Sequence, residues 1–281
     1  MTDYSPYKEL YLKCFTEDTK EDADFLFENV LSKATLISKE YAGRPIAMLF
    51  LMESSLTEKD KTYPFYYLYA ACTHPNFRGK GIMGELLKSA KKTALSKGKL
   101  GIFLKPATKS LFDFYEKYGF NSFFDYSLLL LSSSDLSNLN FTETDYEFLS
   151  LEDWHLLRKE WLPHLCDIYA DFSRSLFLGA TDGLTVAKTE NAAAVFEIRG
   201  NTLLIKEALC LNQDYFALLN LCFTLAKRQG AEKLELRMPK AINSKGFENL
   251  PLTSSPFSVI WCCDNFPLNK FENAYHGFAF D

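Results

Sequence analysis

The chain has 281 residues, 47% of them hydrophobic, so it can bury one large core or two smaller ones. Its net charge of −5 and pI of about 5.5 argue against a broad nucleic-acid-binding surface. The seven cysteines include no C-x-x-C pair and the four histidines are scattered, so we predict neither a disulfide framework nor a metal site. We expect a soluble cytoplasmic protein with no membrane partner, because no signal peptide or bilayer-spanning run is recognisable.

The beginning of the chain predicts two helices, a hairpin and a loop from the spacing of its apolar residues. The helices cover residues 7–15 and 19–31, the hairpin strands 35–39 and 46–52, and the polar loop 54–61.

A glycine-rich turn follows the next apolar segment. Phe65–Thr73 is rich in aromatic and small apolar residues, and we predict it to be a central strand. Arg78-Gly79-Lys80-Gly81 comes directly after it, and a helical pattern with lysines on its far side begins at once. Glycines let a ligand approach the backbone, and the first N–H groups of a helix have no partner within the helix. Because Arg78 and Lys80 add positive charge, the turn predicts a diphosphate-binding site.

The remaining elements of this half complete a sheet. We predict a short buried strand at 100–104, a helix at 110–118 closed by Gly119, and a final strand at 122–131. Antiparallel strands followed by strand–helix–strand–helix–strand predict an α/β fold with a mixed, mostly antiparallel sheet flanked by helices.

Two motifs on these elements resemble the GNAT superfamily of acyl-CoA-dependent N-acetyltransferases. The first is Arg78-Gly79-Lys80-Gly81-Ile82 after the central strand, and the second is Phe114-Tyr115-Glu116-Lys117-Tyr118-Gly119-Phe120. The resemblance covers residues 5–131. Arg78 and Gly81 match the family pattern Q/R-x-x-G-x-G/A, but Met83 stands where Gly or Ala is usual, with Gly84 next to it.

The resemblance implies acetyl-CoA as co-substrate and no metal. The backbone would hold the diphosphate at Arg78, Gly79, Lys80, Gly81, Ile82, Met83 and Gly84. Backbone groups of Ala71, Cys72 and Thr73 would pair with the pantetheine arm and the thioester carbonyl. Tyr115 matches the tyrosine that protonates the leaving thiolate in many members, since a phenol is neutral at pH 7. The alternative is a core tyrosine on its helix.

Several candidates remain open for the general base. Tyr67 stands where histone-type members place a glutamate, although a phenol is a poor base, and Glu53 is an alternative. His74 is more typical of a loop-capping residue than of a catalyst. Two-copy acetyltransferases of the enhanced-intracellular-survival type resemble this layout, and there the C-terminal carboxylate can reach the active site. Because the tail after Asp264 is aromatic and should pack, the resemblance makes Asp281 a further candidate.

The pattern of elements starts again after a polar segment, residues 132–140, that we interpret as a linker. Residues 154–165, 184–188, 192–198, 202–211, 216–229, 233–239 and 257–263 repeat the helix, hairpin, central strand, helix and closing strands. The turn between Cys210 and Phe216 has no arginine or glycine, and Asp214 has the wrong charge for a phosphate. We therefore expect a catalytic GNAT domain at 1–133 and a degenerate GNAT-like domain with a C-terminal tail at 141–281.

The sequence thus predicts an N-acetyltransferase that transfers acetyl from acetyl-CoA to a primary amine by direct attack in a ternary complex. Aromatic residues along the central strand favour a small-molecule or peptide amine, with the second domain shaping the acceptor site. The alternative is a non-catalytic acyl-CoA-binding regulatory protein. An aminoacyl-type transferase is disfavoured because the cofactor turn is kept. We expect a monomer or homodimer.

Overall fold

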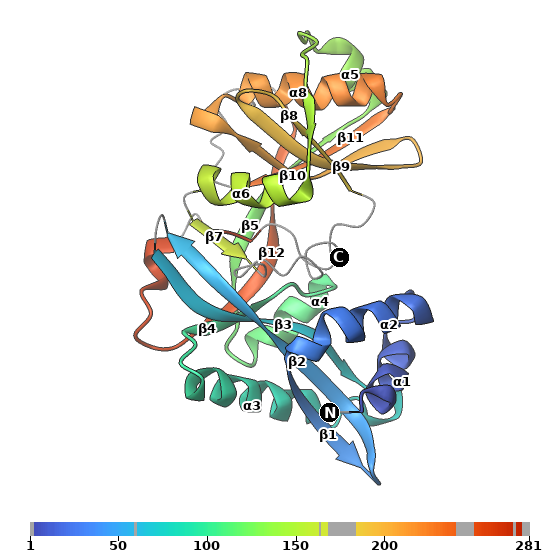
Figure 1. Ribbon diagram of the computed structural model, residues 1–281, viewed down its shortest axis with the longest axis vertical. Coiled ribbons are helices and arrows are strands. Elements are labelled where there is room, and N and C mark those ends of the chain that lie inside the picture. The colour runs from blue at the N-terminus through green and yellow to red at the C-terminus, as the bar shows by residue number, and fades with distance from the viewer. Residues whose placement is uncertain are drawn as a thin grey trace. The chain divides into compact units, whose positions relative to one another are not determined.

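The structure, a computed structural model, describes residues 3–58, 61–162, 164–167, 184–239, 250–271 and 274–276. The chain divides into two compact units (Figure 1). Unit 1 contains residues 1–122, 167–179 and 258–270, and unit 2 contains residues 123–166, 180–257 and 271–281. Each unit has a mixed sheet flanked by helices, which confirms the predicted α/β class. No helix of the described residues is long and apolar enough to cross a bilayer.

The sheet of unit 1 is built on a long antiparallel hairpin. Its strands are β1 (Thr35–Tyr41), β2 (Arg44–Glu58), β3 (Lys61–Thr73), β4 (Gly101–Leu104) and the end of β12 (Leu252–Cys262). The loop predicted at 54–61 is wrong, because β2 and β3 stay paired as far as Glu58 and Lys61. Ser54, Ser55 and Leu56 are buried, so the serines of this segment belong to a buried strand and not to an exposed loop.

The last strand of this sheet comes from the C-terminal half of the chain. Residues 259–262 of β12 pair antiparallel with residues 101–104 of β4. The strand predicted to close the sheet, β5 (Asn121–Leu131), pairs from Tyr126 onward with β11 (Lys233–Pro239) in unit 2. The prediction of a strand at 122–131 is confirmed, but its assignment to the first sheet is wrong. The sequence of an apolar strand does not indicate which sheet the strand joins.

Helices cover both faces of the unit 1 sheet (Figure 1). α1 (Ser5–Cys14) and α2 (Lys20–Asn29) pack on one face, where the rings of Tyr11, Phe27 and Phe50 meet edge to face. α3 (Ile82–Ser96) and α4 (Lys109–Glu116) contribute to the core on the other face, with Leu68 of β3. Short 3₁₀ turns occur at Leu31–Lys33, Pro75–Phe77, Leu211–Gln213 and Leu268–Phe271.

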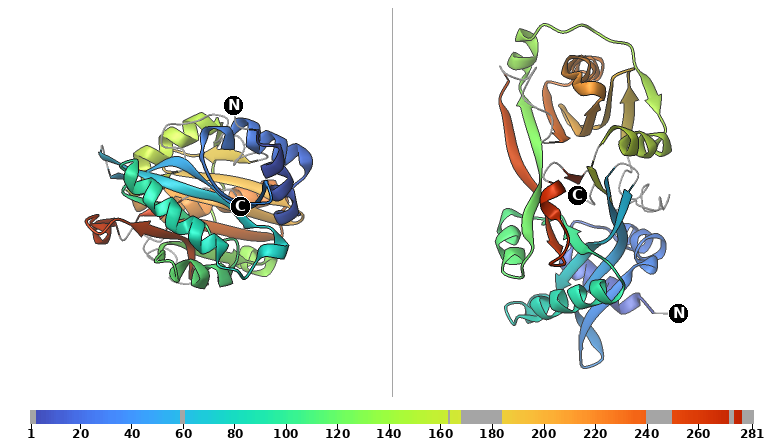
Figure 2. Two further views of the ribbon diagram at one scale, coloured as in Figure 1. Left: turned by 90° about the horizontal axis from the view of Figure 1, so that it is seen from below. Right: turned by 90° about the vertical axis from the view of Figure 1, so that its left-hand side faces the viewer.

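Unit 2 repeats this order of elements. Its further strands are β6 (Glu147–Leu149), β7 (His164–Asp167), β8 (Thr185–Lys188), β9 (Ala192–Arg199), β10 (Thr202–Cys210) and β13 (Tyr275–His276). β8, β9 and β10 are antiparallel, α8 (Tyr215–Arg228) follows, and β11 returns parallel to β10, as β1 to β4 do around α3. Within this unit β5 lies between β11 and the beginning of β12 (Figure 2). α6 (Leu151–Trp161) packs on β10.

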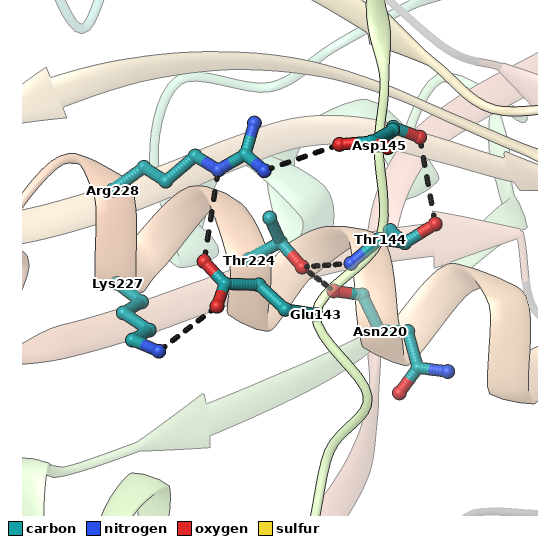
Figure 3. Close-up of polar contacts among 7 residues, drawn as sticks. All are labelled: Glu143, Thr144, Asp145, Asn220, Thr224, Lys227 and Arg228. Carbon is teal, nitrogen blue, oxygen red and sulfur yellow. Dashed lines mark hydrogen bonds and ion pairs between the residues drawn. The ribbon is translucent and has the colours of Figure 1, made fainter.

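The segment interpreted as a linker has regular structure. Ser132 and Asp135 form a capping box that starts α5 (Ser133–Asn138). Farther along, the backbone N–H of Thr144 donates to the Thr224 hydroxyl on α8 at 3.1 Å. Glu143 forms ion pairs with Lys227 and Arg228 at 3.0 and 3.7 Å (Figure 3). The linker interpretation is therefore wrong, because most of the segment 132–140 is a capped helix.

The aromatic tail packs where the structure describes it. In unit 1 the ring of Phe266 lies 5.5 Å from that of Tyr63 and 5.3 Å from that of Phe65. In unit 2 Tyr275–His276 pair parallel with β7.

Candidate functional site

β3 parts from β4 halfway along its length. Parallel pairing joins residues 66–67 only to residues 102–103, whereas β2 follows β3 as far as Thr73. From Leu68 to Thr73, this edge of β3 therefore faces no strand among those described. Unpaired backbone groups on such an edge can pair with an extended ligand. Three residues predicted to hold the pantetheine arm lie on it: Ala71, Cys72 and Thr73.

A bulge interrupts β3 at the start of this open edge. Ala70 has a left-handed φ of 51°, and the pairing register with β2 shifts between Met48 and Phe50. A non-glycine residue in this conformation costs roughly 1–3 kcal/mol and is typical of functional sites. The bulge re-aims the backbone of the residues that follow it. The sequence analysis missed it, because an alanine in an apolar strand gives no sign of a bulge.

The predicted diphosphate turn is an uncapped helix N-terminus. Gly79 and Gly81 both have a φ of 76°, which only glycine adopts without strain, and Gly81 is the N-cap of α3. Gly81 has no side chain to cap the helix. The N–H groups of residues 79–84 have no backbone acceptor among the described residues. Such donors, together with the helix dipole, are what an anion needs for binding at a helix N-terminus.

The cations of the turn are arranged in two ways. Arg78 and Lys80 are both exposed, and the Lys80 ammonium lies 5.0 Å from the centroid of the Phe77 ring. Arg78 folds back, and its Nε donates to the carbonyl oxygen of Thr73 at 3.1 Å. The predicted positive charge is therefore present, and Arg78 also ties the turn to the end of the open edge.

The departure from the family pattern at residues 83–84 has a packing explanation. Ile82 and Met83 are half-buried against the core between the sheet and α3. A Cβ atom added to Gly84 would overlap the hydroxyl end of the Tyr118 ring. Gly84 therefore makes room for Tyr118, and its backbone N–H still belongs to the open first turn. Tyr118 belongs to the second motif but was not among the predicted site residues, and its hydroxyl lies against Gly84 in the first turn of α3.

Tyr115, the predicted acid, lies on the α3 side of the sheet. It is only 6% exposed, and its ring centroid lies 5.3 Å from that of Phe114 and 5.9 Å from that of Phe120. Within the described residues its hydroxyl has no hydrogen-bond partner. Burial raises the pKa of Tyr115 well above the ordinary phenol value, so the hydroxyl keeps its proton at neutral pH. A proton donor needs this protonation state.

The candidate bases differ in their surroundings. Tyr67 is 1% exposed, and its ring stacks on that of Tyr69 with 6.3 Å between centroids. Glu53 forms an ion pair with Lys99, which occupies its carboxylate. Asp281 lies outside the described residues.

His74 caps the turn that follows β3. Its Nδ1 accepts a hydrogen bond from the backbone N–H of Asn76 at 3.3 Å. This contact supports the loop-capping interpretation, because that ring nitrogen is engaged in holding the turn.

A thiol lies beside the end of β3. The Cys14 thiol donates to the carbonyl oxygen of Thr73 at 3.5 Å, the same oxygen that Arg78 binds. A hydrogen bond from Cys72, together with the nearby Arg78 charge, lowers the pKa of Cys14 to about 7. The same contact and burial raise the pKa of Cys72. The Cys14 thiol is therefore more acidic than an ordinary cysteine.

In unit 2 the turn before α8 is capped. Asp214 caps α8, and its Oδ1 accepts a hydrogen bond from the Ala217 N–H at 3.0 Å. β10 also parts from β11, because their pairing stops at Ile205. Beyond that point the buried Glu207 forms an ion pair with Arg158 at 2.7 Å. At α8 the Asp214 carboxylate thus lies at the helix N-terminus, where α3 has none.

Residues 1–123 match the family model of the acetyltransferase (GNAT) domain. No curated protein sequence matches the chain.

Three solved structures are similar in fold. One is a protein of unknown function from Enterococcus faecalis V583, called a probable N-acyltransferase, with TM-score 0.70, 13% identity and coverage of 92% of this chain and 69% of that one. A GCN5-related N-acetyltransferase from Kribbella flavida has TM-score 0.68, 12% identity and coverage of 92% and 68%. Eis1 from Mycobacterium abscessus has TM-score 0.67, 13% identity and coverage of 91% and 70%. At these identities the likeness establishes the fold.

Proposed function

Because residues 1–123 belong to the GNAT acetyltransferase superfamily, we propose that the chain transfers an acetyl group from acetyl-CoA to a primary amine by direct attack in a ternary complex. One observation carries the proposal furthest. In unit 1 the open edge of β3 leads directly into the uncapped N-terminus of α3. A strand edge that can pair with an extended arm, joined to an anion site, fits an acyl-CoA molecule.

The residues of this unit suit such a ligand. The free N–H groups of residues 79–84 would hold the diphosphate, and the positive φ at Gly79 and Gly81 keeps side chains out of its way. The edge at Ala71, Cys72 and Thr73 would bind the pantetheine arm and align the thioester. An N–H aimed at the thioester carbonyl stabilises the negative charge that develops on its oxygen.

Tyr115 is the proposed proton donor. When bound, acetyl-CoA supplies an activated acyl group whose thiolate leaves as the amide forms. Tyr115 lies in the same core as α3 and keeps its proton, so it can protonate that sulfur. A positioned general acid contributes typically about 10²–10⁴-fold to a rate.

We propose a single acyl-CoA site per chain, with unit 2 as a degenerate copy of the same fold. The repeated order of strands around α3 and α8 supports the copy. The Asp214 cap supports its loss of the cofactor, since a carboxylate occupies the place of a phosphate.

An amine panel with acetyl-CoA tests the proposal. Polyamines, aminoglycosides, amino acids and peptides with free N-termini or lysines are incubated with the full chain, and free thiol release is followed over time. The proposal expects release that depends on one class of amine and disappears in Gly81→Val. Tight acetyl-CoA binding without release for any amine would contradict it and favour a non-catalytic acyl-CoA-binding protein.

A further inference from the structure

A pocket of about 530 Å³ lies in unit 1 between α1, the turn that joins β1 to β2, and the loop after β3. A volume of this size is typical of small-molecule sites in proteins. The buried side chains of Leu10 and Ile46 contribute to its wall. Its charged and aromatic lining residues are Glu9, Lys13, Tyr41, Arg44, His74 and Phe77.

Phe77 connects this pocket to the glycine turn. Its ring lines the pocket, and the Lys80 ammonium lies 5.0 Å from the centroid of the same ring. Lys80 directly precedes Gly81, the N-cap of α3. The pocket therefore begins one side chain away from the turn proposed to hold the diphosphate.

Three aromatic side chains of the pocket are in contact with one another. The centroid of the Phe77 ring lies 5.5 Å from that of Tyr41 and 5.9 Å from that of His74. Tyr41 is nevertheless 65% exposed, so its ring is accessible to a ligand. Exposed aromatic rings can stack on a planar base.

The charges of the pocket favour an anion that also carries a donor. Lys13 and Arg44 are exposed, and neither forms an ion pair with another residue that the structure describes. Arginine binds phosphate oxygens through parallel N–H donors, and lysine binds them as a point charge. Glu9 is the only acidic residue among the described residues that line the pocket, and its carboxylate can accept from an amino group.

We propose that this pocket is the subsite for the 3′-phosphoadenosine end of acyl-CoA, with the adenine against Tyr41 and Phe77 and the 3′-phosphate on Arg44 and Lys13. The inference rests on the proposed function, because it places the part of the co-substrate that lies beyond the diphosphate. Adenine supplies the planar base and an amino group for Glu9. The ribose phosphate supplies the anion, and both are joined directly to the diphosphate.

Two shortened ligands separate the contributions of base and phosphate. Acetyl-3′-dephospho-CoA lacks only the 3′-phosphate, and S-acetyl-4′-phosphopantetheine lacks the whole adenosine part. Arg44→Gln and Lys13→Gln each remove one charge, and Tyr41→Leu removes the exposed ring. Lys33→Gln is the matched control, since Lys33 is an exposed lysine of the same unit that does not line the pocket.

Calorimetric titration of the full chain with each ligand tests the subsite. We expect the wild type and Lys33→Gln to bind acetyl-CoA about tenfold more tightly than its 3′-dephospho form. Arg44→Gln and Lys13→Gln should lose most of that ratio, because their Kd for acetyl-CoA rises while their Kd for the 3′-dephospho form stays unchanged. Tyr41→Leu should weaken the binding of both nucleotides by about fivefold. S-acetyl-4′-phosphopantetheine should bind all variants equally.

A free nucleotide could use the same rings and charges at a separate site, and competition distinguishes the two cases. Adenosine 3′,5′-bisphosphate should compete with acetyl-CoA for the wild-type chain. Binding of both ligands at once would show an independent nucleotide site and would overturn the proposal.

Equal Kd values for acetyl-CoA and its 3′-dephospho form in the wild type would also overturn the subsite, as would a tenfold ratio that persists in both charge variants. An unchanged Kd in Tyr41→Leu would show that the base does not lie on that ring. Each of these results leaves acetyl-CoA binding, and with it the proposed function, intact. A wild-type chain that binds no acetyl-CoA would contradict the proposed function itself, and the subsite with it.

Discussion

Asp214 binds the Ala217 N–H at the start of α8, with 3.0 Å between Oδ1 and N. The helix at the same place in unit 1 starts at Gly81, which has no side chain to do this. A carboxylate cap satisfies a first-turn N–H group and opposes a second anion, whereas a glycine cap leaves that group available. The difference supports the proposal of one acyl-CoA site per chain, in unit 1.

Gly81→Ala should weaken acetyl-CoA binding by about tenfold or more. An L-residue at a φ of 76° is strained by roughly 1–2 kcal/mol, and its Cβ would stand in the turn proposed to hold the phosphates. Gly98→Ala is the matched control, because Gly98 ends the same helix with a φ of 71° and open space around it. Calorimetry and urea unfolding should show similar stability losses for both variants and an affinity loss only for Gly81→Ala. Equal affinities would contradict the prediction.

Tyr115→Phe should lower kcat by roughly 10²-fold and leave the Kd for acetyl-CoA unchanged. The ring packing against Phe114 and Phe120 is kept, and only the proton donor is lost. Stopped-flow or steady-state thiol release measures kcat, and calorimetry measures Kd. Tyr146→Phe, in unit 2, controls for the loss of a phenol elsewhere and should behave as wild type. Undiminished turnover in Tyr115→Phe would show that another group protonates the thiolate.

Gly84→Ala should destabilise the chain by about 1–3 kcal/mol, because the new methyl group overlaps the Tyr118 ring. Urea unfolding measures the loss. The double variant Gly84→Ala/Tyr118→Ala removes the obstacle, so its loss should be smaller than the sum of the two single losses. Strict additivity would mean that the two positions do not interact.

Alkylation of Cys14 by iodoacetamide should have a pH midpoint near 7. A depressed pKa means that the thiolate, the reactive form, predominates above about pH 7 and disappears as the pH falls below it. Cys72→Ala removes the hydrogen bond that contributes most, so the midpoint should move upward, and Arg78→Gln should move it in the same direction. Burial raises the pKa of Cys210 to about 12, so that thiol should stay unmodified over the same range. Peptide mass spectrometry resolves the sites. A midpoint at the ordinary thiol value would contradict the described contacts.

Local signals predicted the glycine turn before α3 well. Gly79 and Gly81 mark it because both need a positive φ, and the helical pattern after them locates the start of α3. Gly98 and Gly119 mark the ends of two helices for the same reason, with φ values of 71°. Such features depend on a few consecutive residues, which a sequence displays directly.

Features that depend on distant residues could not be predicted in this way. β5 and β12 are both apolar, and nothing along either strand tells that β12 pairs with β4 and β5 with β11. The polar residues at 132–140 are typical of both linkers and helix caps. In the structure the capping box of Ser132 starts a helix. The bulge at Ala70 likewise comes from packing on β3.

Calorimetric titration of the full chain with acetyl-CoA tests whether the chain has a single acyl-CoA site. We expect one molecule bound per chain in the wild type, no measurable binding in Gly81→Val, and wild-type binding in Asp214→Ala. Two molecules per chain, or undiminished binding in Gly81→Val, would contradict the assignment of a single acyl-CoA site to the turn before α3.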